Sequence, residues 1–370
     1  MAPLLRSFEC DNSNGSRPIE NTIIHTGQHY DAGMSDIFFE ELKIPHPIIN
    51  LGVGSGEHGT QTGQMLEKIE QVLLEKQPDM VVVYGDTNST LAGALAAAKL
   101  HIPVAHIEAG LRSFNRRMPE EINRIVADHV SDLLLAPTPT AIKNLRNEGL
   151  SDKTVLTGDI MYDAVLFNRT VAERRSKILE RLNLVPGDYG VITVHRAENT
   201  DDEARLGILL TAFNDIATNA LQLVFPVHPR TSKLMSSKFL GWLPNPRLHI
   251  IEPLGYLDML RLVSHARITL TDSGGLQKEA FFLGCPCITL REETEWVETV
   301  EAGANVVAGV DPSKVRDALS SWETHLSAGP PDFSGTVTGS FGDGHAAQKI
   351  HDALLSFCSK LRGNRAVPCV

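Results

Sequence analysis

The sequence lacks several features that mark specialised classes of protein. Basic residues are outnumbered by acidic ones, 34 to 45, which gives a formal net charge of −11 and no basic excess for a nucleic-acid partner. Cysteines number only five, and none of them stands in a CxxC pair or in a spacing typical of zinc ligands. We therefore predict no metal site and no disulfide framework, and free thiols fit a reducing compartment.

Long apolar segments are also missing. No run reaches the roughly 18 residues that a membrane-spanning helix needs, and the N-terminal segment lacks the apolar core of a signal peptide. We expect a cytoplasmic protein without a membrane partner. The remaining composition is that of an ordinary globular protein, with 42% hydrophobic and 21% charged residues, and 370 residues suffice for two domains.

Short apolar runs rich in β-branched residues alternate with helical patterns along the first half of the chain. This alternation predicts an α/β protein whose parallel strands are joined by crossover helices. The strands are continuously apolar, as expected when helices cover both faces of a sheet. Strands are expected at residues 21–25, 80–84, 104–107 and 133–136, and helices at 61–77 and 89–100.

The same pattern restarts after a charged stretch, so we predict two α/β halves in tandem. Strands of the second half are expected at residues 190–194, 221–225, 248–251, 266–270, 286–290 and 305–308. A loop is expected at 327–340, where Gly, Pro, Ser and Thr are frequent, and a last helix at 345–360. The predicted domains are 1–164, 165–344, and a C-terminal helix and tail at 345–370 that packs back on the first domain.

The segment TDSGGLQKE, residues 271–279, is the most informative in the chain, because its pattern predicts the end of a strand, a glycine turn and the start of a helix. Backbone N–H groups at the start of such a helix bind phosphate, and Gly274 and Gly275 allow a ligand close to the backbone. Glu279 lies about one turn further along the helix, within reach of a ribose. Together with Ser273 these residues predict a nucleotide-diphosphate site; an ordinary glycine turn is the alternative.

Polar residues also follow other predicted strands, where ligands of α/β sheets bind. In the first half they are Asp86 and Glu108, and Glu120 opens a helix soon after. The alternative to a functional role for Asp86 is that it caps the following helix. For Glu120 the alternative is a favourable interaction with the helix dipole. In the second half, His195-Arg196 and His228-Pro229-Arg230 end strands. Carboxylates beside a nucleotide, without a metal motif, suggest proton transfer at carbon or oxygen.

Motifs spread over about residues 25–350 resemble the non-hydrolysing UDP-N-acetylglucosamine 2-epimerases, in particular their archaeal-type branch. They are HTGQHYD, GDTNST, HIEAGLRS, MPEEINRIVADH, TVHRAEN, HPR, EPLGYLDM, TDSGGLQKEA, REETEWVETVEAGAN and FGDGHAAQKI. The resemblance implies the GT-B fold, with two Rossmann-like domains facing a central cleft, and a homodimer. It also implies anti elimination of UDP to 2-acetamidoglucal followed by re-addition, without cofactor or metal. Some relatives act on modified UDP-sugars, such as the 2,3-diacetamido uronic acid. A modified UDP-sugar is therefore the alternative substrate.

The resemblance also carries residue roles. Its catalytic positions match Asp86, Glu108, Glu120 and His195, and it places His195 against the diphosphate. It assigns the Ser-Gly-Gly turn to the diphosphate and Glu279 to the ribose. The full set of expected UDP or substrate ligands is Gln28, His29, Arg112, Asn123, Arg124, Arg196, Arg230, Ser273, Gly274, Gly275, Glu279 and Arg291.

One departure from the family concerns the first residues. Family members begin with an apolar strand and a Gly-Thr-Arg-Pro-Glu loop, whereas residues 1–6 here resemble the helix that follows. We therefore expect the sequence to lack a central strand, which leaves backbone groups and apolar surface uncovered. Without this loop the sequence would also lack its arginine and the lysine of the short linker after it. Their loss would weaken stabilisation of the departing diphosphate, where one donor contributes about 3 kcal/mol. A UDP-sugar-binding protein without turnover remains an alternative; a GT-B glycosyltransferase is a weaker one, since no acceptor groove is indicated.

Overall fold

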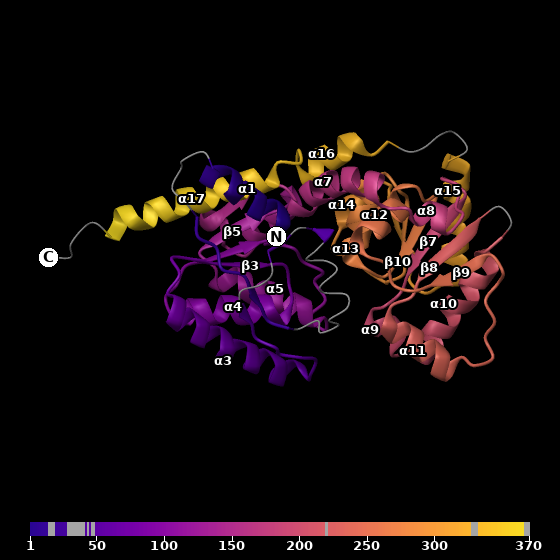
Figure 1. Cartoon of the computed structure of the whole chain (residues 1–370), viewed down its shortest axis with the longest axis horizontal. Coiled ribbons are helices and arrows are strands. Elements are labelled where there is room, and N and C mark those ends of the chain that lie inside the picture. The colour runs from indigo at the N-terminus through magenta and orange to yellow at the C-terminus, as the bar shows by residue number, and fades with distance from the viewer. Residues whose placement is uncertain are drawn as a thin grey trace. The chain divides into compact units, whose positions relative to one another are not determined.

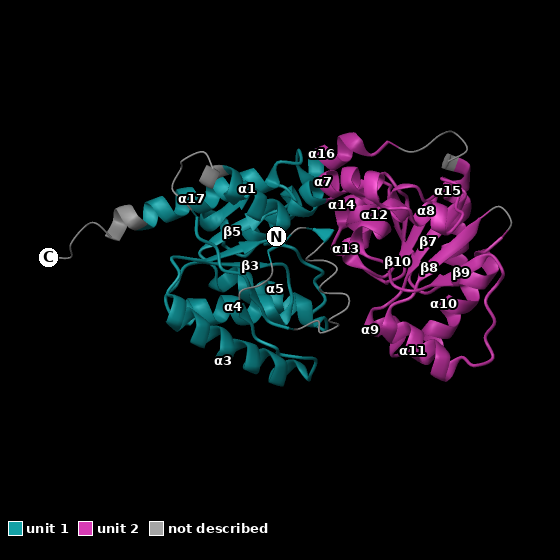
Figure 2. Ribbon diagram, viewed as in Figure 1, with its two compact units in different colours: residues 1–164, 339–370 teal, residues 165–338 magenta. Residues whose placement is uncertain are grey.

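A computed structural model describes residues 1–13, 19–27, 41–42, 44–45, 49–218, 221–326 and 332–365. The chain forms two compact units (Figure 2). The first comprises Met1–Ala164 and Gly339–Val370, and the second comprises Val165–Thr338. Each unit is built around a parallel sheet, and no helix in the described ranges is long and apolar enough to cross a membrane.

The first unit contains a four-stranded parallel sheet in the order β3-β4-β5-β6, and a separate parallel pair, β1-β2. Within the described part of the chain, β3 hydrogen-bonds to a strand on one side only, its neighbour β4. The strands are β1 (Ile24–His25), β2 (Ile49–Asn50), β3 (Val81–Tyr84), β4 (Val104–Ile107), β5 (Leu133–Ala136) and β6 (Thr154–Leu156). The helices are α1 (Ala2–Ser13), α3 (His58–Lys76), α4 (Asn88–Lys99), α5 (Pro119–Val130), α6 (Pro139–Asn147) and α17 (Ala346–Arg365), with a 3₁₀ turn at Ser151–Lys153. Helix α7 (Ile160–Arg175) begins in the first unit and continues into the second.

Helices cover both faces of this sheet, which explains why its strands are continuously apolar (Figure 1). On one face, Phe8 of α1 and Ile350 of α17 pack with Ile107 of β4. On the other, Met65 of α3 and residues of α4 pack with Val104 of the same strand. Successive side chains of β4 therefore enter opposite cores. This double cover leaves the carboxyl ends of the strands as the place for polar residues.

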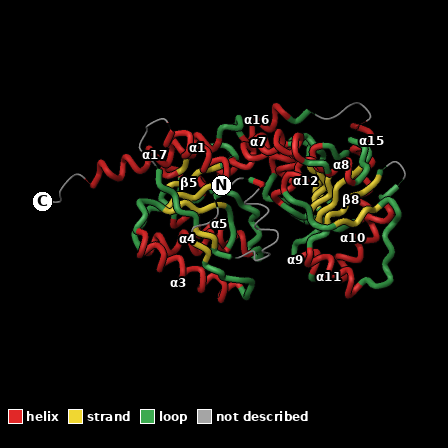
Figure 3. The backbone as a smooth tube through the Cα atoms, in the orientation of Figure 1, coloured by secondary structure: helices red, strands yellow, loops and turns green. Residues whose placement is uncertain are grey.

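The second unit holds a six-stranded parallel sheet in the order β12-β11-β10-β7-β8-β9 (Figure 3). Phe213 of α10 and Trp322 of α15 pack on one face, against Phe225 and Leu270. The strands are β7 (Tyr189–Thr193), β8 (Gln222–Pro226), β9 (Leu248–Ile251), β10 (Ile268–Thr271), β11 (Cys287–Thr289) and β12 (Asn305–Val307). The helices are α8 (Ile178–Arg181), α9 (Ala197–Thr200), α10 (Glu203–Ile216), α11 (Pro229–Lys238), α12 (Tyr256–Ser264), α13 (Gly274–Phe282), α14 (Val297–Glu301), α15 (Pro312–Leu326) and α16 (Ser334–Phe341).

The loop predicted at 327–340 is wrong over its second half, where α16 forms. Asp332 accepts a hydrogen bond from the backbone N–H of Ser334 at the start of this helix. Val337 and Phe341, four residues apart, are both buried. Small and hydroxylated residues concealed this helical spacing in the sequence. Residues 327–331 lie outside the described part of the chain.

Candidate active site

The first unit brings Asp86 and Glu108 together at one edge of its sheet. Tyr84 of β3 lies opposite Ile107 of β4, so the residues that follow these strands emerge side by side. A Cβ atom on Gly85 would lie 3.5 Å from Oε2 of Glu108, which places that carboxylate over the turn carrying Asp86. Glu108 itself has a φ of 73°, a left-handed conformation that costs a non-glycine residue about 1 kcal/mol or more.

Asp86 is held by two side chains of α5. Arg124 donates to Oδ2 of Asp86 from Nη2 at 2.6 Å and from Nε at 3.0 Å. Asn123 donates to the backbone carbonyl of Asp86 at 2.9 Å. Both residues were predicted to bind substrate, and both are buried. In this structure their partners lie within the protein, and they orient the carboxylate.

The pKa of Asp86 is raised above its ordinary value. Burial is the largest cause, Arg124 opposes it, and the charges of Glu108 and Glu120 add to it. The three predicted carboxylates thus act on one another electrostatically. A carboxyl whose pKa moves toward neutrality is better suited to exchange protons at physiological pH.

Glu121, the acid next to Glu120, has a structural role that the sequence did not reveal. Its buried carboxylate accepts hydrogen bonds from the backbone N–H groups of Ser113 and Phe114, each at 2.9 Å. It also pairs with Arg124 at 2.9 Å. Glu121 therefore fixes the loop after Arg112, whereas Glu120 is half-buried in the first turn of α5.

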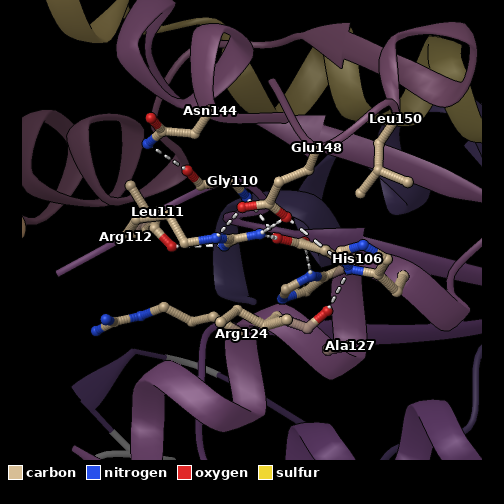
Figure 4. A network of polar contacts seen from close by, with 12 residues as sticks. His106, Gly110, Leu111, Arg112, Arg124, Ala127, Asn144, Glu148 and Leu150 are labelled. Atoms are coloured by element: carbon tan, nitrogen blue, oxygen red, sulfur yellow. Dashed lines mark hydrogen bonds and ion pairs between the residues drawn. The ribbon is translucent and has the colours of Figure 1, made fainter. Parts of the chain in front are cut away.

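Arg112 belongs to a different, buried group of polar residues (Figure 4). Its guanidinium donates twice to Glu148, at 2.7 Å each, and pairs with Asp128 at 2.8 Å. Asp128 also contacts His106. Asp128, Glu148 and His106 were not singled out from the sequence. An acid within the buried face of an amphipathic helix, as at Asp128, was the available signal, since such a residue needs a partner.

In the second unit, the predicted phosphate turn caps α13. The hydroxyl oxygen of Ser273 accepts a hydrogen bond from the backbone N–H of Leu276, and the helix begins at Gly274. A Cβ atom on Gly274 would lie 2.3 Å from Oε1 of Glu295, so a larger residue there would require the Glu295 side chain to move. Helix N-termini of this kind carry backbone N–H groups and a positive dipole end suited to a diphosphate.

Asp272, just before this turn, joins it to the end of β7. Its fully buried carboxylate accepts hydrogen bonds from the backbone N–H groups of His195 and Arg196, at 3.1 and 3.0 Å. The amide of Asn199 donates to the same carboxylate at 3.1 Å. Two segments that are more than 70 residues apart in the sequence thereby meet at one point. Asp272 was not among the predicted site residues.

The imidazole of His195 is the exposed member of this group. Its side chain is 37% exposed, and Nδ1 lies 3.4 Å from Asp272. The His228 ring lies 5.9 Å away between centroids. Burial lowers the pKa of His195, Asp272 opposes this, and Arg196 and His228 lower it further. An anion arriving beside the ring would favour its protonated, donating form.

Four further residues predicted as ligands are Arg230, Arg291, Gln28 and His29. Arg230 is exposed and pairs with Asp201, whereas Arg291 is buried and pairs with Glu295 at 3.0 Å. Gln28 and His29 lie outside the described residues. Among the residues that the structure describes, no group of three or more His, Cys, Asp or Glu side chains is arranged to hold a metal ion.

Comparison with known sequences gives one consistent result. Residues 12–355 match the family described as UDP-N-acetylglucosamine 2-epimerase. A UDP-N-acetylglucosamine 2-epimerase homolog of Methanococcus maripaludis is 49% identical over 91% of this chain and 92% of its own. The UDP-2,3-diacetamido-2,3-dideoxy-D-glucuronate 2-epimerase of Pseudomonas aeruginosa is 52% identical over 79% of this chain and 80% of its own.

Solved structures agree with the sequence comparison. The Methanocaldococcus jannaschii UDP-GlcNAc 2-epimerase, in complex with UDP-GlcNAc and UDP, matches with a TM-score of 0.86 and 45% identity. The match covers 96% of this chain and 95% of that one. A putative epimerase from Listeria monocytogenes matches with a TM-score of 0.82 at 29% identity, covering 96% and 92%. The two α/β units described above thus have the GT-B fold, which confirms the predicted fold class.

Proposed function

From the premise that this chain belongs to the UDP-N-acetylglucosamine 2-epimerase family, we propose that it interconverts UDP-N-acetylglucosamine and UDP-N-acetylmannosamine. The observation that carries the proposal is the meeting of Asp86 and Glu108 at the ends of adjacent strands. Epimerisation at C2 needs groups that remove and return a proton, and carboxylates with interacting charges suit that task.

The proposed reaction is an anti elimination followed by re-addition. A carboxylate removes the C2 proton, the C1–O bond breaks with its electron pair passing to UDP, and 2-acetamidoglucal forms. A carboxyl group then protonates C2 from the opposite face, and UDP re-forms the bond to C1. We propose that the base and the acid are two of the three carboxyl groups of Asp86, Glu108 and Glu120. No redox change occurs, so the scheme requires neither an oxidant nor a reductant.

We assign UDP binding to the second unit. Backbone N–H groups at Gly274 and Gly275 and the hydroxyl of Ser273 would hold the diphosphate, with His195 and Arg196 as further donors. The departing diphosphate gains negative charge as C1–O breaks, and donors already in place stabilise it. Glu279 would accept hydrogen bonds from the ribose hydroxyls.

The decisive experiment is incubation with UDP-N-acetylglucosamine in deuterated water. Removal and return of the C2 proton should place deuterium at C2 of both sugars and yield the manno product, visible by NMR. A folded sample that binds UDP in calorimetry but gives neither label nor product would refute turnover. That result would leave a UDP-sugar-binding protein.

A second substrate is proposed because of one relative. The P. aeruginosa protein named for UDP-2,3-diacetamido-2,3-dideoxy-D-glucuronate shares 52% identity over 295 residues with this chain. The two UDP-sugars differ at C3 and C6, whereas the bonds that break in the reaction are at C1 and C2. Comparing kcat/KM for the two substrates would decide between them.

Glu279 leads to a prediction about pH. Burial raises its pKa to about 7, with Tyr256 and Lys278 opposing the shift. The ionised form accepts hydrogen bonds better than the protonated form, so UDP affinity should rise as pH increases through about 7 and then level off. Calorimetry between pH 6 and 8.5 measures this rise.

The matched control for that prediction is Glu279→Gln. The terminal phosphate of UDP and the imidazole of His195 are also titratable, and the variant keeps both. The difference between wild-type and variant titrations therefore isolates Glu279. Parallel pH curves in the two proteins would show that Glu279 does not contact the nucleotide.

We also propose a homodimer in the cytoplasm. The dimer rests on family resemblance alone, and a monomeric mass near 40.4 kDa in light scattering would contradict it. The location rests on the buried thiols of Cys285 and Cys287, which form no disulfide and fit a reducing compartment, and cell fractionation would test it.

A further inference from the structure

We propose that the buried ion pair of His106 and Asp128 is a positioning device that sets the two carboxylates Asp86 and Glu108 relative to each other. The inference deepens the proposed function and rests on it, because these carboxylates are the ones assigned to the chemistry at C2. Neither His106 nor Asp128 is exposed, so they act through the residues they hold.

His106 lies on β4 and contacts an acceptor with each ring nitrogen. Its Nδ1 is 2.7 Å from Oδ1 of Asp128, and its Nε2 is 2.8 Å from the backbone carbonyl of Gly85. The Gly85 carbonyl can only accept, and Asp128 also pairs with Arg112 and accepts from the N–H of Gly110, which favours its ionised form. With Asp128 ionised, both ring nitrogens donate and the ring is an imidazolium. Burial alone would lower the pKa of His106, but Asp128 and the Gly85 carbonyl raise it overall.

Asp128 holds the chain on both sides of Glu108. Its Oδ1 contacts His106, two residues before Glu108, and its Oδ2 accepts from the N–H of Gly110, two residues after, at 3.1 Å. A Cβ atom on Gly110 would lie 2.6 Å from the Ala141 carbonyl, so this turn is tightly packed. These contacts hold Glu108 in its left-handed conformation, which an unconstrained glutamate would leave.

The same pair reaches the other carboxylate through β3. His106 holds the carbonyl of Gly85, the residue directly before Asp86. The Glu108 carboxylate lies over this glycine, where a side chain would meet it. One charged hydrogen-bonded unit therefore joins the two strand ends that carry Asp86 and Glu108. Misplacement of reacting groups by about 1 Å can lower a rate by about 100-fold.

The surrounding charges are balanced. His106 and Arg112 are positive, Asp128 and Glu148 are negative, and Arg112 bridges the two acids. Removing one charge from such a buried set leaves another uncompensated, which is costly. Loss of the Asp128 charge would therefore favour a neutral His106. A neutral ring has one donor, so it cannot serve both Asp128 and Gly85.

The test substitution is Asp128→Asn, which keeps the shape and removes the charge. We expect kcat for C2 exchange to fall by about 100-fold, while KM stays within about threefold, since nucleotide binding is assigned elsewhere. The matched control is Asp132→Asn, because the Asp132 carboxylate accepts from the N–H of Val104 at the opposite end of the same strand, at 2.9 Å. Asp132 is exposed, so the control removes a carboxylate charge beside the same strand without breaking the buried set, and it should leave kcat unchanged.

Histidine ¹⁵N spectra provide a readout that a merely structural role would not move. At pH 8 the wild-type His106 should show two protonated ring nitrogens, and Asp128→Asn should show a single neutral tautomer; His106→Gln assigns the signal. If the Asn variant does not fold, His106→Gln tests the same link, because Asp128 keeps Arg112 and Gly110 as partners. It should then show the same loss of kcat.

The outcomes separate this inference from the proposed function. A wild-type protein without C2 exchange would refute the proposed function and the positioning role with it. Full wild-type exchange with a neutral His106 would refute the positioning role alone. So would equal kcat values in Asp128→Asn and Asp132→Asn.

Discussion

Glu108→Gln is expected to lower kcat for C2 exchange by about 10³-fold, within the range for loss of a general acid or base. Glutamine has nearly the same shape as glutamate, but it can neither take a proton from C2 nor return one. The left-handed backbone at Glu108 does not depend on the side-chain charge, so the fold should persist. Deuterium incorporation at C2 measures the loss, and UDP calorimetry shows whether binding is retained.

The control for this prediction is Glu67→Gln, an exposed position on α3 in the same unit. It removes the same charge from the protein without touching the strand ends. Its kcat should equal that of the wild type. Exchange by Glu108→Gln within about tenfold of wild type would exclude Glu108 from proton transfer, and Asp86 and Glu120 would become the candidates.

His195→Ala is expected to lower kcat by about 100-fold, the effect of removing one donor from a developing anion. The imidazole of His195 lies beside Asp272, and it is partly exposed, so it can donate a hydrogen bond to a bound diphosphate. The backbone N–H of residue 195 still donates to Asp272 in the variant, so the turn itself should keep its shape. The loss should therefore appear in kcat more than in stability.

His249→Ala serves as the comparison, since His249 lies on β9 of the same unit and hydrogen-bonds Gln222. It removes an imidazole away from the phosphate turn. Steady-state kinetics should show wild-type kcat and KM for this variant. If His195→Ala behaved the same way, His195 would have no part in leaving-group stabilisation.

The strands were the most predictable part of the fold, because their pattern is local. Predicted residues 104–107, 133–136 and 248–251 coincide with β4, β5 and β9. The two-residue strand β2 and the edge strand β6 are too short to leave such a pattern, and both were missed, whereas β1 lies within the predicted strand 21–25. Helix α16 was missed because its apolar residues are separated by glycine, serine and threonine.

The site was less predictable than the fold, because a side chain's partners are distant in sequence. Asn123 and Arg124 are predicted to contact substrate, and the structure adds that they reach back 37 and 38 residues to Asp86. Arg112 reaches forward 36 residues to Glu148. A sequence motif shows that a polar residue is present. It does not show whether the hydrogen-bond partner of that residue belongs to the protein or to the ligand.

The sequence by itself determined the α/β fold and the family, because strand periodicity, strand-end motifs and their order are properties of the chain alone. It also placed the candidate carboxylates in the first half and a Ser-Gly-Gly turn, predicted to bind phosphate, in the second. Only the tertiary structure decided which polar residues hold others in place. Asp128 and Asp272 each join segments that the sequence separates, since a buried carboxylate must find donors wherever folding brings them.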